Sequence, residues 1–302
     1  MNRLLALSLC ASVAAVASSH AAGPSYVPGR TPDGQPDVSG IWVNFDPTPF
    51  ETGGQPAFND VALGVNPAAN WAENAPPTSR ANAARKAMVV DPSDGIVPVM
   101  PWAEAKRAYD LQHVNDNCVS QTPWERCITR GIPAGMFPAG YDNAYRFIQT
   151  PGYVVIAYEM IHQARVIPLD GRPHLGARIR QWDGDPRGHW DGNTLVVDTT
   201  NYNDKGSIAT SAATGRIRGI PQSEALHVVE RFRIVDANTI DYQVTIDDPN
   251  VYTKPWRVEI PLSRDAKYQM YEYARAEGNY ATPNMLAAGR AADGAEKSGA
   301  GQ

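Results

Sequence analysis

The chain has 302 residues, of which 27 are basic and 32 acidic, and its formal net charge is −5. No run of Lys or Arg exceeds two residues, which argues against nucleic acid and against an anionic membrane surface as partners. The hydrophobic fraction of 43% permits a packed core, and the 25 prolines and 25 glycines favour turns over long helices.

The N-terminus has the pattern of a secretory signal. Residues 1–3 form a short basic start, residues 4–17 are apolar and uncharged, and small residues at Ser19 and Ala21 suit cleavage. We therefore predict that residues 1–21 are a signal peptide and that the mature protein is periplasmic or secreted. The apolar run is too short for a comfortable membrane span, so no membrane insertion is expected after cleavage.

Residues 22–144 are predicted to be a loop-rich, Pro-rich wrap with one or two short helices. A first strand is expected at 38–45, and helices are expected at 79–89 and 101–114, the second because Pro101 suits a first helical turn. Within this region Cys118 and Cys127 close a short loop. In an oxidising compartment they are predicted to form a disulfide, with two free thiols as the alternative.

From residue 145 to about 280 the chain reads as strands joined by turns. The expected strands are 147–149, 153–159, 164–168, 194–199, the hairpin 226–247, 256–262 and 268–273. Residues 153–158 are apolar on both faces and are predicted to be a fully buried strand, whereas 183–193 reads as turns. We predict a mainly β, antiparallel barrel or sandwich in one structural unit, with a flexible Ala/Gly-rich tail at 281–302.

The hairpin can be registered residue by residue. A three-residue turn at 236–238, with Asn238 suited to a left-handed conformation, pairs Val235 with Thr239. Glu230 then lies opposite Val244 on an otherwise apolar face. A buried carboxylate is either paired or functional, and burial without a partner would raise its pKa. Glu230 is therefore the first catalytic candidate, as a general acid or base. The alternative is a structural ion pair with Arg165, Arg178 or Arg231.

His227 is the second candidate, because the same register places it opposite Asp247 on the other face, as a base and its orienting carboxylate would lie. A surface ion pair is the alternative. Glu159 and His162 flank a turn at a strand end, where polar groups commonly line a barrel mouth, and complete the candidate catalytic set. The candidate ligand-binding residues are Arg165, Arg231, Asp247 and Tyr242.

Several chemistries lack their signatures. There is no Gly-x-Ser-x-Gly, phosphate loop or Gly-x-Gly-x-x-Gly, and the mature histidines form no closely spaced pair. Three aspartates at 183–191 lack the closing glutamate of a calcium loop. No cofactor and no metal are predicted.

Several segments together resemble a widespread family of exported bacterial proteins without an established function. The matching segments are 30–37 with 40–42, 149–152, 170–174, 190–199, 226–232, 253–256 and 277–279. Within them, Gly40-Ile41-Trp42 is similar to the first-strand Gly-x-Trp of lipocalin-type barrels. The resemblance implies an exported β-rich protein and brings no known chemistry. A cysteine that often precedes the last segment in similar sequences is absent here, where residues 274–276 are Ala-Arg-Ala.

Three functional hypotheses follow. The first is an exported acid–base enzyme of lyase, isomerase or hydrolase type, acting on a small, partly apolar molecule in a barrel pocket. The second is a periplasmic lipocalin-like carrier of a small hydrophobic ligand, with Glu230 as an anchor. The third is an envelope structural protein whose charged residues simply pair.

Overall fold

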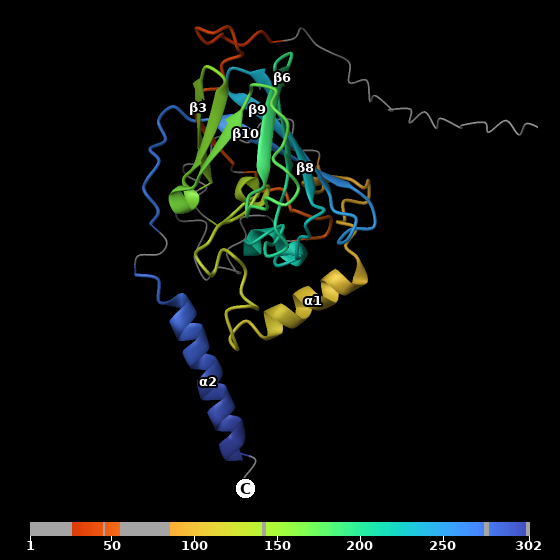
Figure 1. Ribbon diagram of the computed structural model, residues 1–302. Coiled ribbons are helices and arrows are strands. Elements are labelled where there is room, and N and C mark those ends of the chain that lie inside the picture. Colours follow the sequence, from red (N-terminus) through yellow and green to blue (C-terminus); the bar gives the residue numbers. More distant parts are fainter. Residues whose placement is uncertain (1–25, 45, 55–84, 141–142, 275–277, 300–302) are drawn as a thin grey trace, which may run out of the picture.

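The computed structural model describes residues 26–44, 46–54, 85–140, 143–274 and 278–299 (Figure 1). The strands are β1 (Gly40–Val43), β2 (Val89–Asp91), β3 (Ala144–Thr150), β4 (Tyr153–Tyr158), β5 (Ala164–Pro168), β6 (Asp185–Asp191), β7 (Thr194–Thr200), β8 (His227–Asp236), β9 (Thr239–Asp247) and β10 (Trp256–Arg264). The helices are α1 (Pro101–Gln112) and α2 (Ala281–Gly299), and short 3₁₀ segments are η4 (Ala134–Met136), η5 (Met160–His162) and η6 (Ala212–Ile217). Among these residues no helix is both long and apolar enough to cross a membrane.

The strands form a nearly closed, antiparallel, barrel-like sheet. The order around it is β5-β4-β3-β1-β10-β9-β8-β7-β6, and the short β2 pairs with β10 outside this path. The predicted mainly β, antiparallel fold is thus confirmed, in a barrel-like form. The edges β5 and β6 approach each other without pairing as strands. Gly188 on β6 lies so close to Ile167 and Leu169 that an added Cβ would stand 2.7 Å from a side-chain carbon of each.

Alternate residues of the long strands fill the barrel interior. On β8, β9 and β10 every second side chain is buried, as the period of a strand requires. Phe232 packs against Phe147 and Tyr242, with ring centroids 5.5 and 4.8 Å apart. Burying each such ring stabilises the fold by about 1.5–3 kcal/mol. Trp42 of β1 is fully buried, and the Arg264 guanidinium lies 4.3 Å from its ring centroid.

A buried segment closes the end of the barrel at which β4 finishes. Residues 129–139, including η4, are all buried, and we call them the plug. The Tyr145 hydroxyl donates to the carbonyl of Met136 at 3.3 Å, and Gly135 packs against the ring of Tyr158. The predicted N-terminal wrap therefore covers this end of the barrel. Figure 1 shows α1 and α2 lying beyond the body of the sheet.

The structure corrects several predicted elements. Residues 185–191, read as turns, form strand β6, which the sequence hid because Pro186 and Gly188 are poor strand formers that an edge position tolerates. Strand β4 was predicted to be buried on both faces, but only one face is buried and the other is partly exposed. Residues 268–273 are not a strand.

Two further predictions concern the ends of the chain and the helices. Residues 281–299 form helix α2 where a flexible tail was predicted, in keeping with the high helix propensity of alanine. The predicted helix at 101–114 is confirmed as α1. The predicted signal peptide lies outside the described residues, as do residues 79–84 of the predicted helix at 79–89. The described part of that helix, residues 85–89, is not helical, and Val89 begins strand β2.

Candidate functional site

The β8–β9 hairpin has the predicted register over most of its length. Glu230 lies opposite Val244 and His227 opposite Asp247, as expected. The turn differs, because Thr239 pairs with Asp236 and the register shifts between Ile234 and Asp236. Val235 is thus an extra residue in β8, and such a bulge restores the expected pairing beyond it. Asn238 does not have the left-handed conformation predicted for it.

Glu230 forms a buried ion pair across the barrel, which we call the interior pair. Nη2 of Arg165 on β5 donates to Oε2 of Glu230, and the side chains are 4% and 0% exposed. The Tyr242 hydroxyl donates to Oε1 at 3.0 Å, and Arg165 also reaches Thr199 Oγ1 at 3.3 Å. The structure therefore brings together three of the predicted site residues. Of the three arginines considered, Arg165 is the donor.

Tyrosines surround the interior pair. Burial raises the pKa of Tyr158, Tyr202 and Tyr242 above the ordinary value, with the Glu230 charge adding to this and the Arg165 charge opposing it. These hydroxyls are therefore protonated at neutral pH. The hydroxyls of Tyr158 and Tyr202, and Nε and Nη1 of Arg165, make no well-aligned hydrogen bond within the described residues.

His227 lies on the outer face of the barrel and its carboxylate partner is not the predicted one. Its Nε2 is 3.1 Å from Oδ2 of Asp198 on β7, so the ring turns away from Asp247 toward the other neighbouring strand. The His227 and Asp198 side chains are 42% and 40% exposed. The predicted pairing of strand positions is thus confirmed, while Asp247 is replaced as orienting group by Asp198.

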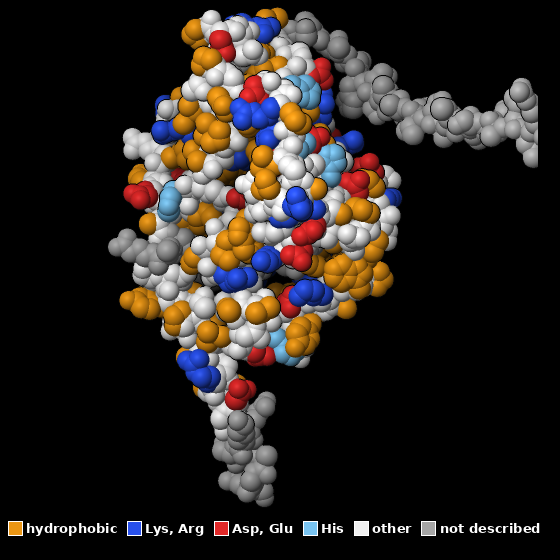
Figure 2. Space-filling view, in the orientation of Figure 1, with side chains coloured by type: hydrophobic (Ala, Val, Ile, Leu, Met, Phe, Trp, Pro, Cys, Tyr) orange, Lys and Arg blue, Asp and Glu red, His pale blue; other side chains and the backbone are white. Residues whose placement is uncertain are grey.

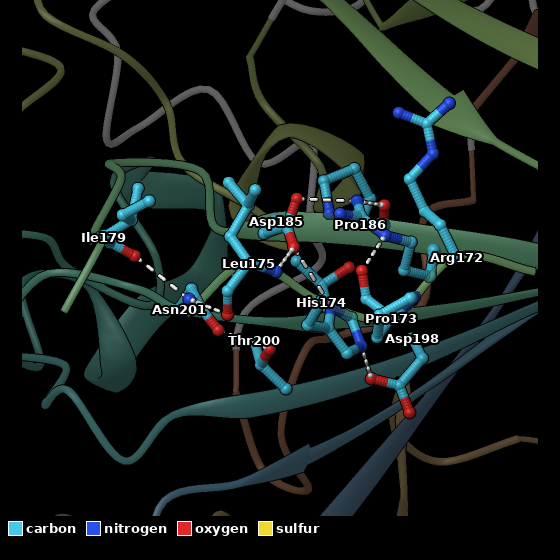
Figure 3. Close-up of polar contacts among 12 residues, drawn as sticks. Arg172, Pro173, His174, Leu175, Ile179, Asp185, Pro186, Asp198, Thr200 and Asn201 are labelled. Carbon is cyan, nitrogen blue, oxygen red and sulfur yellow. Dashed lines mark hydrogen bonds and ion pairs between the residues drawn. The ribbon is translucent and has the colours of Figure 1, made fainter. Parts of the chain in front are cut away.

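A second histidine joins the same carboxylate, as Figure 3 shows. His174, from the loop between β5 and β6, places Nε2 3.1 Å from Asp198 Oδ1 and Nδ1 3.3 Å from Asp185 Oδ2. Asp185 is held by the backbone N–H of Leu175 at 2.8 Å and by the Arg187 guanidinium at 2.6 Å. We call His174, Asp185, Asp198 and His227 the outer-face site.

The loop that carries His174 is held by the residue that follows β7. Asn201, which has a left-handed backbone with φ of 60°, donates through Nδ2 to the carbonyls of Leu175, Gly176 and Ile179. These contacts hold the loop over the sheet. The position of His174 is therefore set both by the anchored loop and by its own contacts with Asp185 and Asp198. Figure 2 shows histidines exposed among acidic and basic side chains on one face of the molecule.

The carboxylate partners favour particular roles for the ring nitrogens of the two histidines. A carboxylate only accepts, so the contact favours a proton on Nε2 of His227, and in the neutral ring Nδ1 then has a lone pair. Both nitrogens of His174 face carboxylate oxygens, at 3.3 and 3.1 Å, so whichever nitrogen carries a proton donates it to a carboxylate. The arrangement therefore offers one partly exposed base, oriented by a carboxylate that a second histidine holds in place.

His174 and Asp198 were not among the predicted site residues, and Asp185 was considered only among the three aspartates at 183–191. A signal was present, since His174 ends the segment 170–174, Asp198 lies within 190–199 and His227 within 226–232. These three segments were singled out separately, and the fold brings them to one place.

The remaining predicted residues lie elsewhere. Glu159 is buried and accepts hydrogen bonds from the Tyr268 hydroxyl at 2.8 Å and the Tyr271 N–H at 3.0 Å. His162 contacts the Tyr273 carbonyl through Nδ1 at 2.9 Å. Both side chains thus fasten the segment that follows β10. Arg231 forms an exposed ion pair with Asp191 at 2.8 Å.

The predicted disulfide is not formed in the structure. Cys118 is exposed and Cys127 partly buried, and both are free thiols. Cys127 has a left-handed backbone with φ of 57°, and its Sγ contacts Nδ2 of Asn279 at 2.7 Å. The thiol is thus directed toward the segment that precedes α2.

In the part of the chain that the structure describes, no three His, Cys, Asp or Glu side chains are arranged to hold a metal ion. Comparison with protein-family models, characterised proteins and solved structures finds no match to this chain.

Proposed function

We propose that this protein is an exported acid–base enzyme in which His227 is the general base. The observation that carries this proposal is the 3.1 Å contact between His227 Nε2 and Asp198 Oδ2 on a partly exposed face. A carboxylate behind an imidazole fixes its tautomer and stabilises the imidazolium that forms when the ring takes a proton. The resulting Nδ1 lone pair is directed away from Asp198.

The proposed chemistry needs only proton movement. Nδ1 of His227 takes a proton from a carbon acid or from an attacking water and later returns it, which suits elimination, isomerisation or hydrolysis. Asp198 keeps its hydrogen bond to Nε2 throughout, and His174 holds Asp198 from the loop side. Val229 lies opposite Asp198 in the sheet and offers an apolar surface, which favours a small, partly apolar substrate.

The interior pair is less suited to this role. Glu230 is fully buried and both of its oxygens have donors, so it has the properties of the structural ion pair that the sequence left open. Catalysis by His227 at the outer face needs no opening of the barrel.

The proposal is tested with two small probes, hydrolysis of p-nitrophenyl butyrate and uptake of solvent deuterium by cyclohexanone. We expect His227→Gln to lower kcat/KM for the active probe by roughly 10²–10⁴-fold, the usual contribution of a general base. Asp198→Asn should lower it too. The matched control is His189→Gln, which removes an exposed histidine of β6 on the same outer face. Equal rates for His227→Gln and wild type would refute the assignment.

Binding of a small polar molecule inside the barrel is a second candidate function. It is favoured by Nε and Nη1 of Arg165 and the hydroxyls of Tyr158 and Tyr202, whose contacts with one another and with Thr199 are poorly aligned, because buried polar atoms ordinarily have well-aligned partners. Native mass spectrometry of protein purified from a periplasmic extract tests it. A bound molecule that is lost from Tyr158→Phe would support a carrier, and a ligand-free protein would count against one.

A further inference from the structure

A cleft separate from both sites lies between α1, residues 119–126 and the loops at 204–207 and 219–221. Its volume is about 250 Å³, which is below the range usual for drug-sized ligands. None of its lining residues belongs to the outer-face site or to the interior pair. Any ligand that it takes is therefore a small molecule bound independently of the proposed catalytic base.

The walls of the cleft are joined by a hydrogen bond and an ion pair. Arg107 of α1 donates through Nε to the carbonyl of Arg218 at 2.8 Å, and Arg218 in turn pairs with Glu125 of the segment 119–126. Gly219 lies against side-chain carbons of Arg107 and Thr122. A pocket whose walls are tied together in this way is preformed, so a ligand loses less free energy to ordering the protein.

The charge lining the cleft is predominantly positive. Lys106, Arg107, Arg126 and Lys205 line it, against Asp110 and Asp204. Lys106 is neutralised by Asp110 at 2.6 Å, and Arg107 pairs with Glu104 at 3.3 Å. The side chains of Arg126 and Lys205 form no ion pair or hydrogen bond with any residue that the structure describes. They are the two cations available to a ligand.

The uncharged part of the lining combines apolar side chains with hydroxyl groups and the amide of Gln121. Leu111, Val119, Pro123 and Pro221 supply apolar surface, and Ser120 and Ser207 supply hydroxyl groups. From these observations we infer that the cleft binds a small organic anion, with its carboxylate or phosphate group held by Arg126 and Lys205 and its apolar part against the prolines and aliphatic side chains.

Calorimetric titration of the full chain with benzoate, phenyl phosphate and benzamide tests the inference. Benzamide has the shape of benzoate without its charge, so we expect it to bind about tenfold more weakly because the ionic contact is lost. Raised salt should weaken binding of both anions, because the cations are near the surface. Tighter binding of phenyl phosphate would indicate a phosphorylated ligand, and tighter binding of benzoate a carboxylate.

The variant Arg126→Gln/Lys205→Gln should weaken binding of the preferred anion about tenfold or more. The matched control is Arg178→Gln/Lys254→Gln, which removes the same charges from exposed positions outside the cleft and should bind as wild type does. Circular dichroism checks that both variants fold. Equal affinity for benzoate and benzamide, unchanged binding by the cleft variant, or no binding of either anion would overturn the inference.

Discussion

Glu230 shows how a single side chain takes its role from partners that are remote in sequence. Its inward position follows from strand alternation alone, but its ion-pair partner, Arg165, is 65 residues away in the chain. Removing one member of a buried pair leaves the other charged, desolvated and unpaired. For this reason a single substitution in the pair and a substitution of both members have different expected effects on stability.

We expect Glu230→Gln to lower the free energy of unfolding by about 3–5 kcal/mol, because it leaves the Arg165 guanidinium buried without its counter-ion. The double variant Arg165→Met/Glu230→Leu should be close to wild type or more stable, since apolar side chains of similar size avoid the desolvation cost. Urea unfolding measures all three proteins.

Arg231→Gln is the control for this comparison. Arg231 is on the same strand as Glu230, and its substitution breaks only an exposed ion pair with Asp191 of β6. This variant should change the free energy of unfolding by less than about 1 kcal/mol. A Glu230→Gln protein as stable as Arg231→Gln would show that the interior pair has little structural importance.

At the scale of elements, the contact between β5 and β6 completes the barrel. These two edges meet through side chains, and Gly188 provides the space for Ile167 and Leu169. A glycine on a strand usually weakens it, but here the missing Cβ permits a close approach of two edges.

Gly188→Ala is expected to lower the free energy of unfolding by about 1–3 kcal/mol, because the added methyl group overlaps both neighbouring side chains and forces them to shift. Chemical denaturation measures the effect. Gly176→Ala is the control, since an added Cβ there meets nothing within 4 Å and that glycine has no positive φ. A loss of stability at Gly176 equal to that at Gly188 would contradict the closure argument.

At the scale of the whole molecule, buried tyrosines make the fold sensitive to alkaline pH. Burial raises the pKa of Tyr145 to about 12, above its ordinary value of 10.0, and it also raises the pKa of Tyr158, Tyr202, Tyr242 and Tyr252. A group whose pKa is higher in the folded than in the unfolded state contributes stability below the unfolded pKa. This contribution is lost as pH rises through the folded pKa.

The free energy of unfolding should therefore be nearly constant up to about pH 9 and fall between about pH 10 and 12, by roughly 1.4 kcal/mol per pH unit for each such tyrosine. Urea unfolding at a series of pH values measures this slope. The slope for Tyr145→Phe should be smaller than that of wild type by roughly 1.4 kcal/mol per pH unit, which is the contribution of one tyrosine. An unchanged slope would show that Tyr145 does not ionise on unfolding in this range.

The sequence by itself determined the antiparallel β character, the register of the β8–β9 hairpin beyond its turn and the inward position of Glu230. These features depend on a two-residue period and on a turn between neighbouring segments, which are local properties. It did not reveal β6, because an edge strand tolerates Pro186 and Gly188.

Only the tertiary structure decided the partners of the functional candidates. It paired Glu230 with Arg165, and it turned His227 toward Asp198, which lies 29 residues away, instead of toward its register partner Asp247. It also brought the loop residue His174 to the same carboxylate. Strand order and loop placement set these contacts through packing between distant segments, and no local pattern of residues encodes which outward-facing carboxylate an imidazole meets.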